Sequence, residues 1–362
     1  MSDTRQTALL TLHNELQAKM ISFAGYLMPL HYPAGIIKEH QHTRTKAGLF
    51  DISHMGQIHL MGDHCAAALE KLVPSDIQAL KPGAQRYTVL SNESGGIIDD
   101  LIIANLGTHY CLIVNAARKH ADLQHLQQHL SSQCQISLQT EQALLALQGP
   151  LAVDIVKYYA PELESMPYMS IRQTQINHIS CTVSRSGYTG EDGFEISVAN
   201  ADAIKLAQTF LSHPEVLPVG LGARDSLRLE AGLCLYGHEL TATITAVEAN
   251  LSWLIAKDRS NYLGAASIQE QIQQGAEKYR VGILADHKGI LRQGTELYDK
   301  NGNKVGTISS GSFGASLLKP VAMAYVKAQH TATGTQLFAR QRNKEIAVSI
   351  CPLPFVKHRY FR

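Results

Sequence analysis

Two adjacent carboxylates are the residues of this sequence best suited to chemistry. Asp99 and Asp100 stand in the run 97–103, which otherwise consists of Ile and Leu and follows the turn-forming cluster 92–96. The stretch 87–104 therefore predicts a β-hairpin. Successive strand residues point to opposite faces, so one carboxylate faces each side. Because an isolated carboxylate is costly to bury, at least one needs a partner: a distant Arg, backbone amides or a ligand. An Asp that only ends a strand or bonds a turn is the alternative.

A glycine-rich segment at 186–196 supplies a second group of candidates. Its three glycines within seven residues allow another group to approach the backbone closely. Tyr188 offers a flat stacking surface, and Glu195 offers a planar pair of acceptor oxygens. This combination suits a flat heterocycle with adjacent N–H donors. A glycine-rich β-turn with exposed acidic side chains is the alternative.

A third group lies where a predicted helix begins after the apolar run 216–219. The sequence Gly-Leu-Gly-Ala-Arg-Asp at 220–225 is a poor dinucleotide-binding loop, because Asp225 would put a negative charge beside a pyrophosphate. Arg224 and Arg228 are four residues apart and share one helical face. They can clamp a carboxylate of the protein or of a ligand. An internal salt bridge is the alternative.

Metal and thiol chemistry are disfavoured. His40 and His42 point in different directions on a helix, and no third ligand is spaced to join them. Cys234 lacks the surroundings of a nucleophile, and a thiol in the core is the better interpretation. No two of the six cysteines form a Cys-x-x-Cys pair, which favours buried thiols in a reducing compartment; the cysteines are Cys65, Cys111, Cys134, Cys181, Cys234 and Cys351.

Composition narrows the class of protein. The 362 residues are 45% hydrophobic and 17% charged, as in an ordinary globular protein of two or three domains. A net charge of +1 without a basic block argues against nucleic-acid binding. No apolar run approaches membrane-spanning length, and the N-terminus resembles neither a signal peptide nor a transit peptide. We therefore expect a cytoplasmic protein that binds neither membranes nor nucleic acid.

The elements that position these residues follow from periodicity and turn signals. The segment 49–62 predicts a strand, but Asp51, Ser53 and His54 interrupt it and mark a bend or a site. A domain boundary is expected at 148–150, where Gly and Pro punctuate the chain. From residue 278 onward, short strands alternate with turns, which predicts a small barrel or sandwich. The remaining expected elements are helices at 36–47, 63–72, 116–132 and 222–233, and strands at 19–24, 110–115 and within 171–199.

Taken together, these segments resemble the T-protein family of the glycine cleavage system. The resemblance is close to about residue 265 and looser beyond it, and the matching runs are 23–32, 39–56, 95–102, 113–117, 147–150, 184–196, 220–240, 247–253 and 306–317. Three positions depart from the family pattern: Tyr26 replaces the usual Trp, and Ala246 and Ala315 replace the usual Pro. These departures touch loop stiffness, not the charged groups, so we expect activity to survive.

The resemblance implies an α+β fold: a multidomain cloverleaf of three domains around a central folate site. The first domain would be discontinuous, with residues 1–50 and 150–265. The second would span 51–149 and carry the hairpin with the two Asp residues. The third would be the β-rich C-terminal region 266–362, a barrel or jelly-roll-like fold.

The resemblance also implies an activity, that of a tetrahydrofolate-dependent aminomethyltransferase. The enzyme would take an aminomethyl group carried on the dihydrolipoyl arm of the H-protein and pass its methylene to tetrahydrofolate. Ammonia and 5,10-methylenetetrahydrofolate would be released, and the enzyme would work alongside the P- and L-proteins without a metal. A non-catalytic folate-binding partner of the iron–sulfur assembly type is the alternative, but a mere binder does not need the pair of Asp residues.

The same resemblance assigns roles to residues. Asp100 would be the catalytic acid, and Glu195 would grip the N–H edge of the pterin. Tyr87, Tyr168 and Tyr188 would line the folate site, and the residues that would also contact the folate or contribute to its site are Arg224, Tyr360, Met55 and Asn115.

Overall fold

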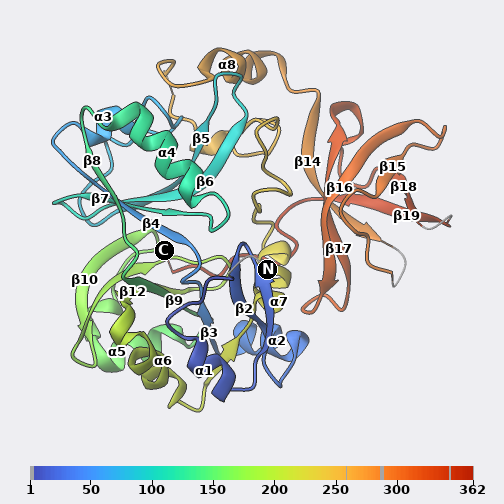
Figure 1. Ribbon diagram of the computed structural model, residues 1–362. Coiled ribbons are helices and arrows are strands. Elements are labelled where there is room, and N and C mark those ends of the chain that lie inside the picture. The colour runs from blue at the N-terminus through green and yellow to red at the C-terminus, as the bar shows by residue number, and fades with distance from the viewer. Residues whose placement is uncertain (1–3, 258, 286–288, 342–343, 362) are drawn as a thin grey trace.

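The computed structural model describes residues 4–257, 259–285, 289–341 and 344–361, and these fold into three β-rich bodies (Figure 1). In that view a six-stranded sheet lies at the lower left, a five-stranded sheet at the upper left and a closed barrel at the right. Helices α5 (Ala152–Tyr159) and α6 (Ala203–Leu211) lie on the outer side of the six-stranded sheet, whereas α7 (Leu221–Glu230) lies in the middle of the molecule, beside the barrel. This mixed α and β content in three parts is the arrangement that the sequence predicts.

The six-stranded sheet joins distant parts of the chain. Its β3–β13 pair is parallel, and its other pairs are antiparallel. Because β9 pairs with β3, the chain returns to this sheet at residue 142, before the expected boundary at 148–150. The strands in spatial order are β10 (Ser170–Ile176), β11 (Ile179–Arg185), β12 (Gly193–Ala199), β9 (Gln142–Gln148), β3 (Ala47–Asp51) and β13 (Val216–Val219).

The five-stranded sheet contains the predicted hairpin. The chain crosses from β3 of the six-stranded sheet into β4 (Gly56–Met61) of this sheet just after Asp51, so the polar residues of 51–54 do mark a bend, as expected. Asn92 holds the hairpin turn, because its Oδ1 accepts the backbone N–H groups of Ser94 and Gly96. The strands in spatial order are β5 (Gln85–Ser91), β6 (Ile97–Asn105), β7 (Tyr110–Val114), β4 (Gly56–Met61) and β8 (Gln135–Leu138).

The C-terminal region closes into a barrel, as the alternation of short strands and turns predicts. All of its strand pairs are antiparallel. Closure leaves no free sheet edge. The strands in spatial order are β14 (Lys278–Ala285), β17 (Lys319–Lys327), β16 (Lys304–Gly314), β15 (Glu296–Tyr298), β18 (Gln336–Gln341) and β19 (Lys344–Cys351).

The helices are short, and among the described residues none is long and apolar enough to cross a membrane. A separate two-stranded ribbon consists of β1 (Lys19–Phe23) and β2 (Tyr26–His31). The α-helices are α1 (Leu10–Glu15), α2 (Ile36–Thr45), α3 (Cys65–Leu69), α4 (Lys119–Leu130), α5 (Ala152–Tyr159), α6 (Ala203–Leu211), α7 (Leu221–Glu230) and α8 (Ala265–Gln274).

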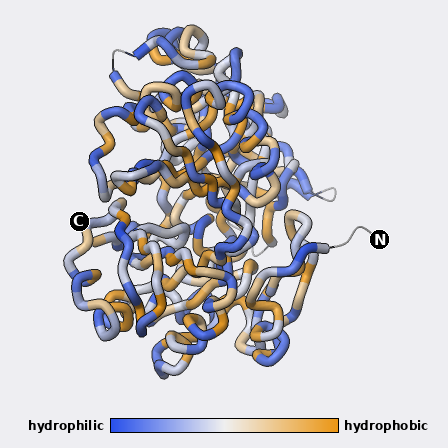
Figure 2. Tube along the Cα trace, turned by 60° about the vertical axis from the view of Figure 1, so that its left-hand side comes forward, coloured by the Kyte–Doolittle hydropathy of each residue, from blue (hydrophilic) through white to orange (hydrophobic). Residues whose placement is uncertain are grey.

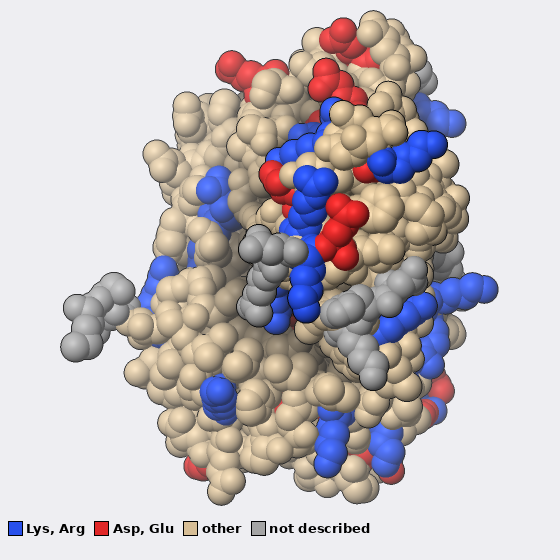
Figure 3. Space-filling model, turned by 90° about the vertical axis from the view of Figure 1, so that its right-hand side faces the viewer, with Lys and Arg blue, Asp and Glu red and all other residues tan. Residues whose placement is uncertain are grey.

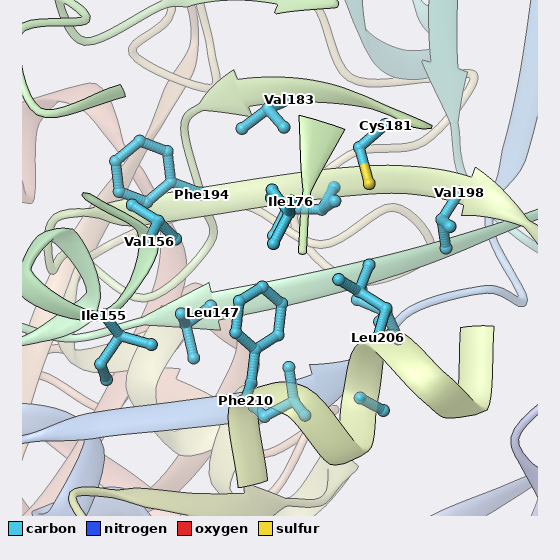
Figure 4. Close-up of a cluster of buried hydrophobic side chains, with 14 of the residues drawn as sticks. Leu147, Ile155, Val156, Ile176, Cys181, Val183, Phe194, Val198, Leu206 and Phe210 are labelled. Carbon is cyan, nitrogen blue, oxygen red and sulfur yellow. The ribbon is translucent and has the colours of Figure 1, made fainter. Parts of the chain in front are cut away.

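Each of the three bodies has its own hydrophobic core. The largest lies between the six-stranded sheet and the helices α5 and α6, where Phe194 and Phe210 are fully buried (Figure 4). Hydrophobic and hydrophilic stretches alternate along the chain (Figure 2), whereas the central strand β3 is buried along its whole length. On the side seen in Figure 3, acidic and basic side chains lie close together without forming a patch of one sign. The three cores therefore set the frame, and the functional side chains lie where the bodies meet.

Candidate active site

The hairpin strand β6 places the two Asp side chains differently. Asp99 is fully buried, whereas Asp100 is only partly buried, as the alternation of strand faces predicts. A close approach of another segment fixes the hairpin here: Gly96 pairs with Thr245, and a Cβ on Gly96 would overlap with the carbonyl group of Ala242. The hairpin whose strand β6 carries the Asp pair is thus anchored to the loop that follows α7.

One amide joins the two carboxylates. Asn115, directly after β7, has its Nδ2 2.9 Å from Oδ1 of Asp99 and 2.8 Å from Oδ1 of Asp100. Its backbone N–H donates to Oδ2 of Asp99 over 3.1 Å. The hydroxyl group of Tyr87 on β5 donates to Oδ2 of Asp100 over 3.0 Å. The two carboxylates therefore differ in burial because they lie on opposite faces of the strand, but both accept a hydrogen bond from Asn115.

Burial and the neighbouring Asp99 charge raise the pKa of Asp100 to about 7, although the hydrogen bonds from Tyr87 and Asn115 oppose this rise. A carboxyl group with a pKa near neutrality can take up and release a proton at working pH. It is also held by donors on both oxygens, so it does not need to reorganise during a reaction. Asp100 is thus a suitable acid–base or electrostatic group.

The close approach to the backbone that the three glycines predict is made by the protein itself at Gly187 and Gly193. A Cβ on Gly187 would overlap with the Gln148 side chain, and a Cβ on Gly193 would lie 2.5 Å from the Leu147 carbonyl oxygen. Buried Gln148 donates through Nε2 to the Ser186 carbonyl over 2.8 Å, and its Oε1 accepts the Thr189 hydroxyl over 2.8 Å. Gln148 thereby fixes the loop that carries Tyr188.

Arg224, Tyr188 and Glu195 come together although they belong to α7, the glycine-rich loop and β12. The Arg224 guanidinium lies 4.8 Å from the centroid of the Tyr188 ring, and its Nη2 is 3.8 Å from Sδ of Met55. Burial raises the pKa of Glu195, while the Arg224 charge and a 3.2 Å hydrogen bond from the Ser186 hydroxyl oppose the rise. Among the described residues, buried Nη1 of Arg224 has no hydrogen-bond acceptor. Such an orphaned donor is costly unless a ligand satisfies it.

Arg228 has a different role from its neighbour one turn away. Its Nε is 2.8 Å from Oδ1 of Asp225, and its Nη1 is 2.8 Å from Oε2 of Glu239. Nη2 donates over 2.9 Å to the Ser310 hydroxyl in the barrel. The internal salt bridge left open for this pair of arginines is therefore the correct interpretation for Arg228, while Arg224 faces the candidate site.

The glycines that begin α7 serve packing, which explains why they mimic a dinucleotide-binding loop. A Cβ on Gly220 would overlap with the carbonyl of Leu30 on β2, and one on Gly222 would meet Ile36. Glu39 holds the junction, since its two oxygens accept the backbone N–H groups of Tyr32 (2.6 Å) and Gly220 (2.9 Å). The close helix–strand contact fixes where Arg224 points.

Tyr168 and Tyr360 form a pair of their own. Their rings stack with centroids 4.1 Å apart and planes at 8°, and the backbone N–H of Tyr168 donates to the Phe361 carbonyl. This stack joins the segment before β10 to the C-terminal segment. The structure thus brings together Asp100, Asn115 and Tyr87 in one group and Arg224, Tyr188, Glu195 and Met55 in another, with Tyr168 and Tyr360 as a third.

The group around Asp100 and the group around Arg224 interact electrostatically. Burial is the main cause that raises the pKa of the Tyr188 hydroxyl, and the charge of Asp100 raises it further. That hydroxyl donates to the carbonyl of Cys234.

Sequence reasoning missed Trp253. Its ring stacks on that of Tyr87, with centroids 6.0 Å apart and planes at 23°, while 68% of the residue remains exposed. It is the one Trp of the chain, and that rarity within a matching run was the available signal.

The departures from the family pattern are accommodated locally. The Tyr26 hydroxyl lies 2.8 Å from Nζ of buried Lys119, which also donates to the His54 carbonyl over 2.7 Å. Ala246 and Ala315 are both buried, so neither substitution lies in an exposed loop.

Within the described part of the chain, no group of three or more His, Cys, Asp or Glu side chains could hold a metal ion.

Comparison with known proteins gives one consistent family. A family model described as the GCVT N-terminal domain matches residues 9–259, and one described as the glycine cleavage T-protein C-terminal barrel domain matches residues 278–357. The mitochondrial aminomethyltransferase of Dictyostelium discoideum is 40% identical over 380 residues, covering 99% of this chain and 94% of that protein. The human mitochondrial aminomethyltransferase is 38% identical over 368 residues, covering 99% of this chain and 91% of that protein.

A solved structure agrees with these relatives. The crystal structure of glycine cleavage system aminomethyltransferase T from Bartonella henselae superposes with a TM-score of 0.95 at 41% identity, covering 99% of this chain and 100% of that chain. The predicted α+β cloverleaf with a C-terminal barrel is confirmed, and the alternative of a non-catalytic partner is not favoured. With both family domains matched in order along nearly the whole chain, this protein belongs to the glycine cleavage T-protein family, the aminomethyltransferases of the glycine cleavage system.

Proposed function

We propose that this aminomethyltransferase transfers the methylene of an aminomethyl group from the dihydrolipoyl arm of the H-protein to tetrahydrofolate. Ammonia, dihydrolipoyl H-protein and 5,10-methylenetetrahydrofolate are the products. The observation that carries the proposal is the buried Arg224 guanidinium with an unsatisfied Nη1, beside the Glu195 carboxylate and within electrostatic reach of Asp100 through Tyr188.

The residues fit a folate in three respects. Nη1 of Arg224 is a buried donor that an electronegative ligand atom can satisfy. Glu195 is an acceptor that the adjacent N–H groups of a pterin can use, and the Tyr188 ring adjoins the cationic side chain. Tyr87 and Trp253 supply stacked aromatic surface next to Asp100. We therefore assign the cofactor-binding role to Glu195, Arg224, Tyr188 and Tyr87, with Met55 as a wall beside Arg224.

Asp100 is proposed as the catalytic group. Tetrahydrofolate, when bound, supplies the amine that accepts the one-carbon unit, and positive charge develops as ammonia leaves. A carboxylate that two fixed donors hold in a poorly hydrated place stabilises that charge without reorganising. Its pKa of about 7 also lets it hold or release a proton during the exchange.

Replacing Glu195 by Ala is expected to weaken tetrahydrofolate binding by roughly 1.5–3 kcal/mol, because paired hydrogen bonds from a desolvated ring to a charged acceptor are lost. Isothermal titration calorimetry measures this directly. Glu296→Ala is the matched control, since that carboxylate lies on the barrel and is 44% exposed. An unchanged affinity in Glu195→Ala would remove this residue from the folate site.

A second expected result concerns the donor. Turnover with the loaded carrier protein should exceed turnover with free aminomethyl-dihydrolipoyl amide at the same concentration, because docking positions the reacting arm. Steady-state rates with both donors at matched concentrations give the comparison. Equal rates would contradict the dependence on a protein carrier.

We also propose a cytoplasmic location. The proposal is supported by six free cysteines, of which all but Cys351 are buried, as suits a reducing compartment. Fractionation of cells followed by immunoblotting tests it, and recovery only in an organelle fraction would overturn it.

A further inference from the structure

A second acidic side chain lies behind the Asp99–Asp100 pair. Asp122 belongs to the polar helix α4, yet it is fully buried, and its carboxyl group is a neighbour of the buried Asp99 carboxyl group. Both oxygens of Asp122 are buried, and among the described residues no N–H or hydroxyl group donates to either. A buried carboxyl group in this condition needs a proton of its own or a shared one.

Two ionised carboxylates cannot form a hydrogen bond with each other, because both are acceptors only. A contact between the buried Asp99 and Asp122 groups therefore requires one proton between them. Burial followed by the Asp122 carboxyl raises the pKa of Asp99, and burial raises the pKa of Asp122, so both directions favour retention of that proton. Arg118, one helical turn before Asp122, favours keeping the remaining single negative charge.

We propose that Asp99 and Asp122 share one proton and that this pair, through Asn115, holds the carboxyl group of Asp100 in place, which makes Asp122 a positioning residue for the transfer reaction. The positioning role rests on the proposed role of Asp100, whereas the shared proton does not. The proton ties β6 to α4, so the oxygens of Asp99 cannot turn away from their donors.

The hydrogen bonds explain how the pair acts at a distance. Asp99 accepts the backbone N–H and the Nδ2–H of Asn115 on its two oxygens, which fixes the amide with its NH₂ side toward Asp100. Turned by half a rotation, the amide would present its oxygen to the Asp100 carboxylate and repel it. A singly charged pair also repels Asp100 less than two full charges would.

The other groups around these carboxyls stay in one protonation state near neutral pH. Tyr87 donates to Asp100, the charge of Asp100 acts on Tyr188, and the charges of all three carboxyl groups act on Tyr236; burial is the largest cause that raises the pKa of each phenol above its usual value. Burial likewise raises the pKa of the nearby Cys234 thiol to about 12. Proton uptake in this region therefore belongs to the three Asp residues.

A pair of substitutions at Asp122 separates a shared proton from a need for charge. In Asp122→Asn the side-chain NH₂ replaces the shared proton as a permanent donor to Asp99, whereas Asp122→Ala removes the partner. We expect Asp122→Ala to lose about 10-fold in kcat with little change in the KM for the loaded carrier, because Asp100 is misplaced. Asp122→Asn should regain most of this loss. Asp154→Asn and Asp154→Ala, on the exposed face of α5, are the matched controls.

A readout that does not depend on activity completes the test. In a pH titration of protein carrying ¹³C-labelled Asp carboxyl groups, followed by NMR, we expect a carboxyl resonance that titrates well above the usual Asp range and disappears in Asp122→Asn. The Asp100 resonance, identified by its loss in Asp100→Asn, should remain in the spectrum of Asp122→Asn.

Three outcomes would overturn the proposal or a stated half of it. If no carboxyl group other than Asp100 titrates above the usual range in the wild type, the proton is not shared. If Asp122→Asn is as slow as Asp122→Ala, a charge at this position and not a donor is required. If the anomalous titration is present but Asp122→Ala keeps full kcat, the positioning role falls; an active Asp100→Asn would instead show that the proposed role of Asp100 is at fault.

Discussion

Asp100→Asn is expected to fold normally, to bind tetrahydrofolate nearly as well as the wild type, and to lose roughly 10²-fold or more in turnover, the usual scale for a lost acid–base or electrostatic group. The amide keeps the shape of the carboxylate, and its oxygen can still accept from Nδ2 of Asn115. The Tyr87 hydroxyl can turn to accept from the new NH₂ group. Single-turnover kinetics with the loaded carrier, beside calorimetry with tetrahydrofolate, separates the step from binding.

The pH dependence gives this prediction a second check. Folding raises the pKa of Asp100 from its ordinary value of 3.8 to about 7, so between these values the folded chain binds more protons than the unfolded chain. The slope of unfolding free energy with pH is then negative, and the contribution of Asp100 to stability is lost as pH rises through about 7. Asp100→Asn removes this loss, so the variant should gain stability relative to the wild type as pH rises. Turnover of the wild type should rise over the same pH range, because Asp100 becomes ionised.

Asp99→Asn is the internal comparison for this prediction. Asp99 accepts hydrogen bonds on both oxygens from Asn115, so an amide would set its NH₂ group against a donor and cost stability more than rate. If Asp100→Asn turned over near the wild-type speed while Asp99→Asn was inactive, the roles of the two carboxylates would be exchanged.

Arg228→Met is expected to lower the free energy of unfolding by about 3–5 kcal/mol, the cost of removing one partner from a buried ion pair. Arg228 is 1% exposed and Glu239 is fully buried, so the variant would leave the Glu239 carboxylate without its guanidinium. The variant would also lose the Ser310 bond between α7 and the barrel. Urea denaturation at neutral pH, analysed for both midpoint and slope, measures the change.

The matched control is Arg340→Met, which breaks an exposed pair with Glu345 at 3.4 Å on the barrel surface. Exposed pairs of this kind contribute about 0–1 kcal/mol, because water screens them and long side chains lose freedom in forming them. Similar losses in both variants would show that burial of Arg228 carries no special cost. If the loss of unfolding free energy in Arg228→Met disappears at low pH, the cost comes from the unpaired charge of Glu239, which protonation removes.

The sequence alone determined the local elements and the residues with chemistry. The hairpin at 87–104, the bend after Asp51 and the C-terminal barrel follow from alternation, turn residues and interrupted strands, which depend on neighbours along the chain. That Asp99 and Asp100 differ in burial also follows from the period of a strand, whereas which of the two is the buried one does not. Family resemblance supplied the roles that periodicity does not carry.

Only the tertiary structure decided which partner each polar side chain meets. Arg224 and Arg228 share one helical face, yet one lies at the candidate site and the other is bound to Glu239, because β16 of the barrel packs on the second. Asn115 reaches both carboxylates, and α4 brings Asp122 onto Asp99. Burial and charge neighbours set a pKa, and both come from segments far apart in sequence, so no local pattern could have revealed the proton that this pair holds.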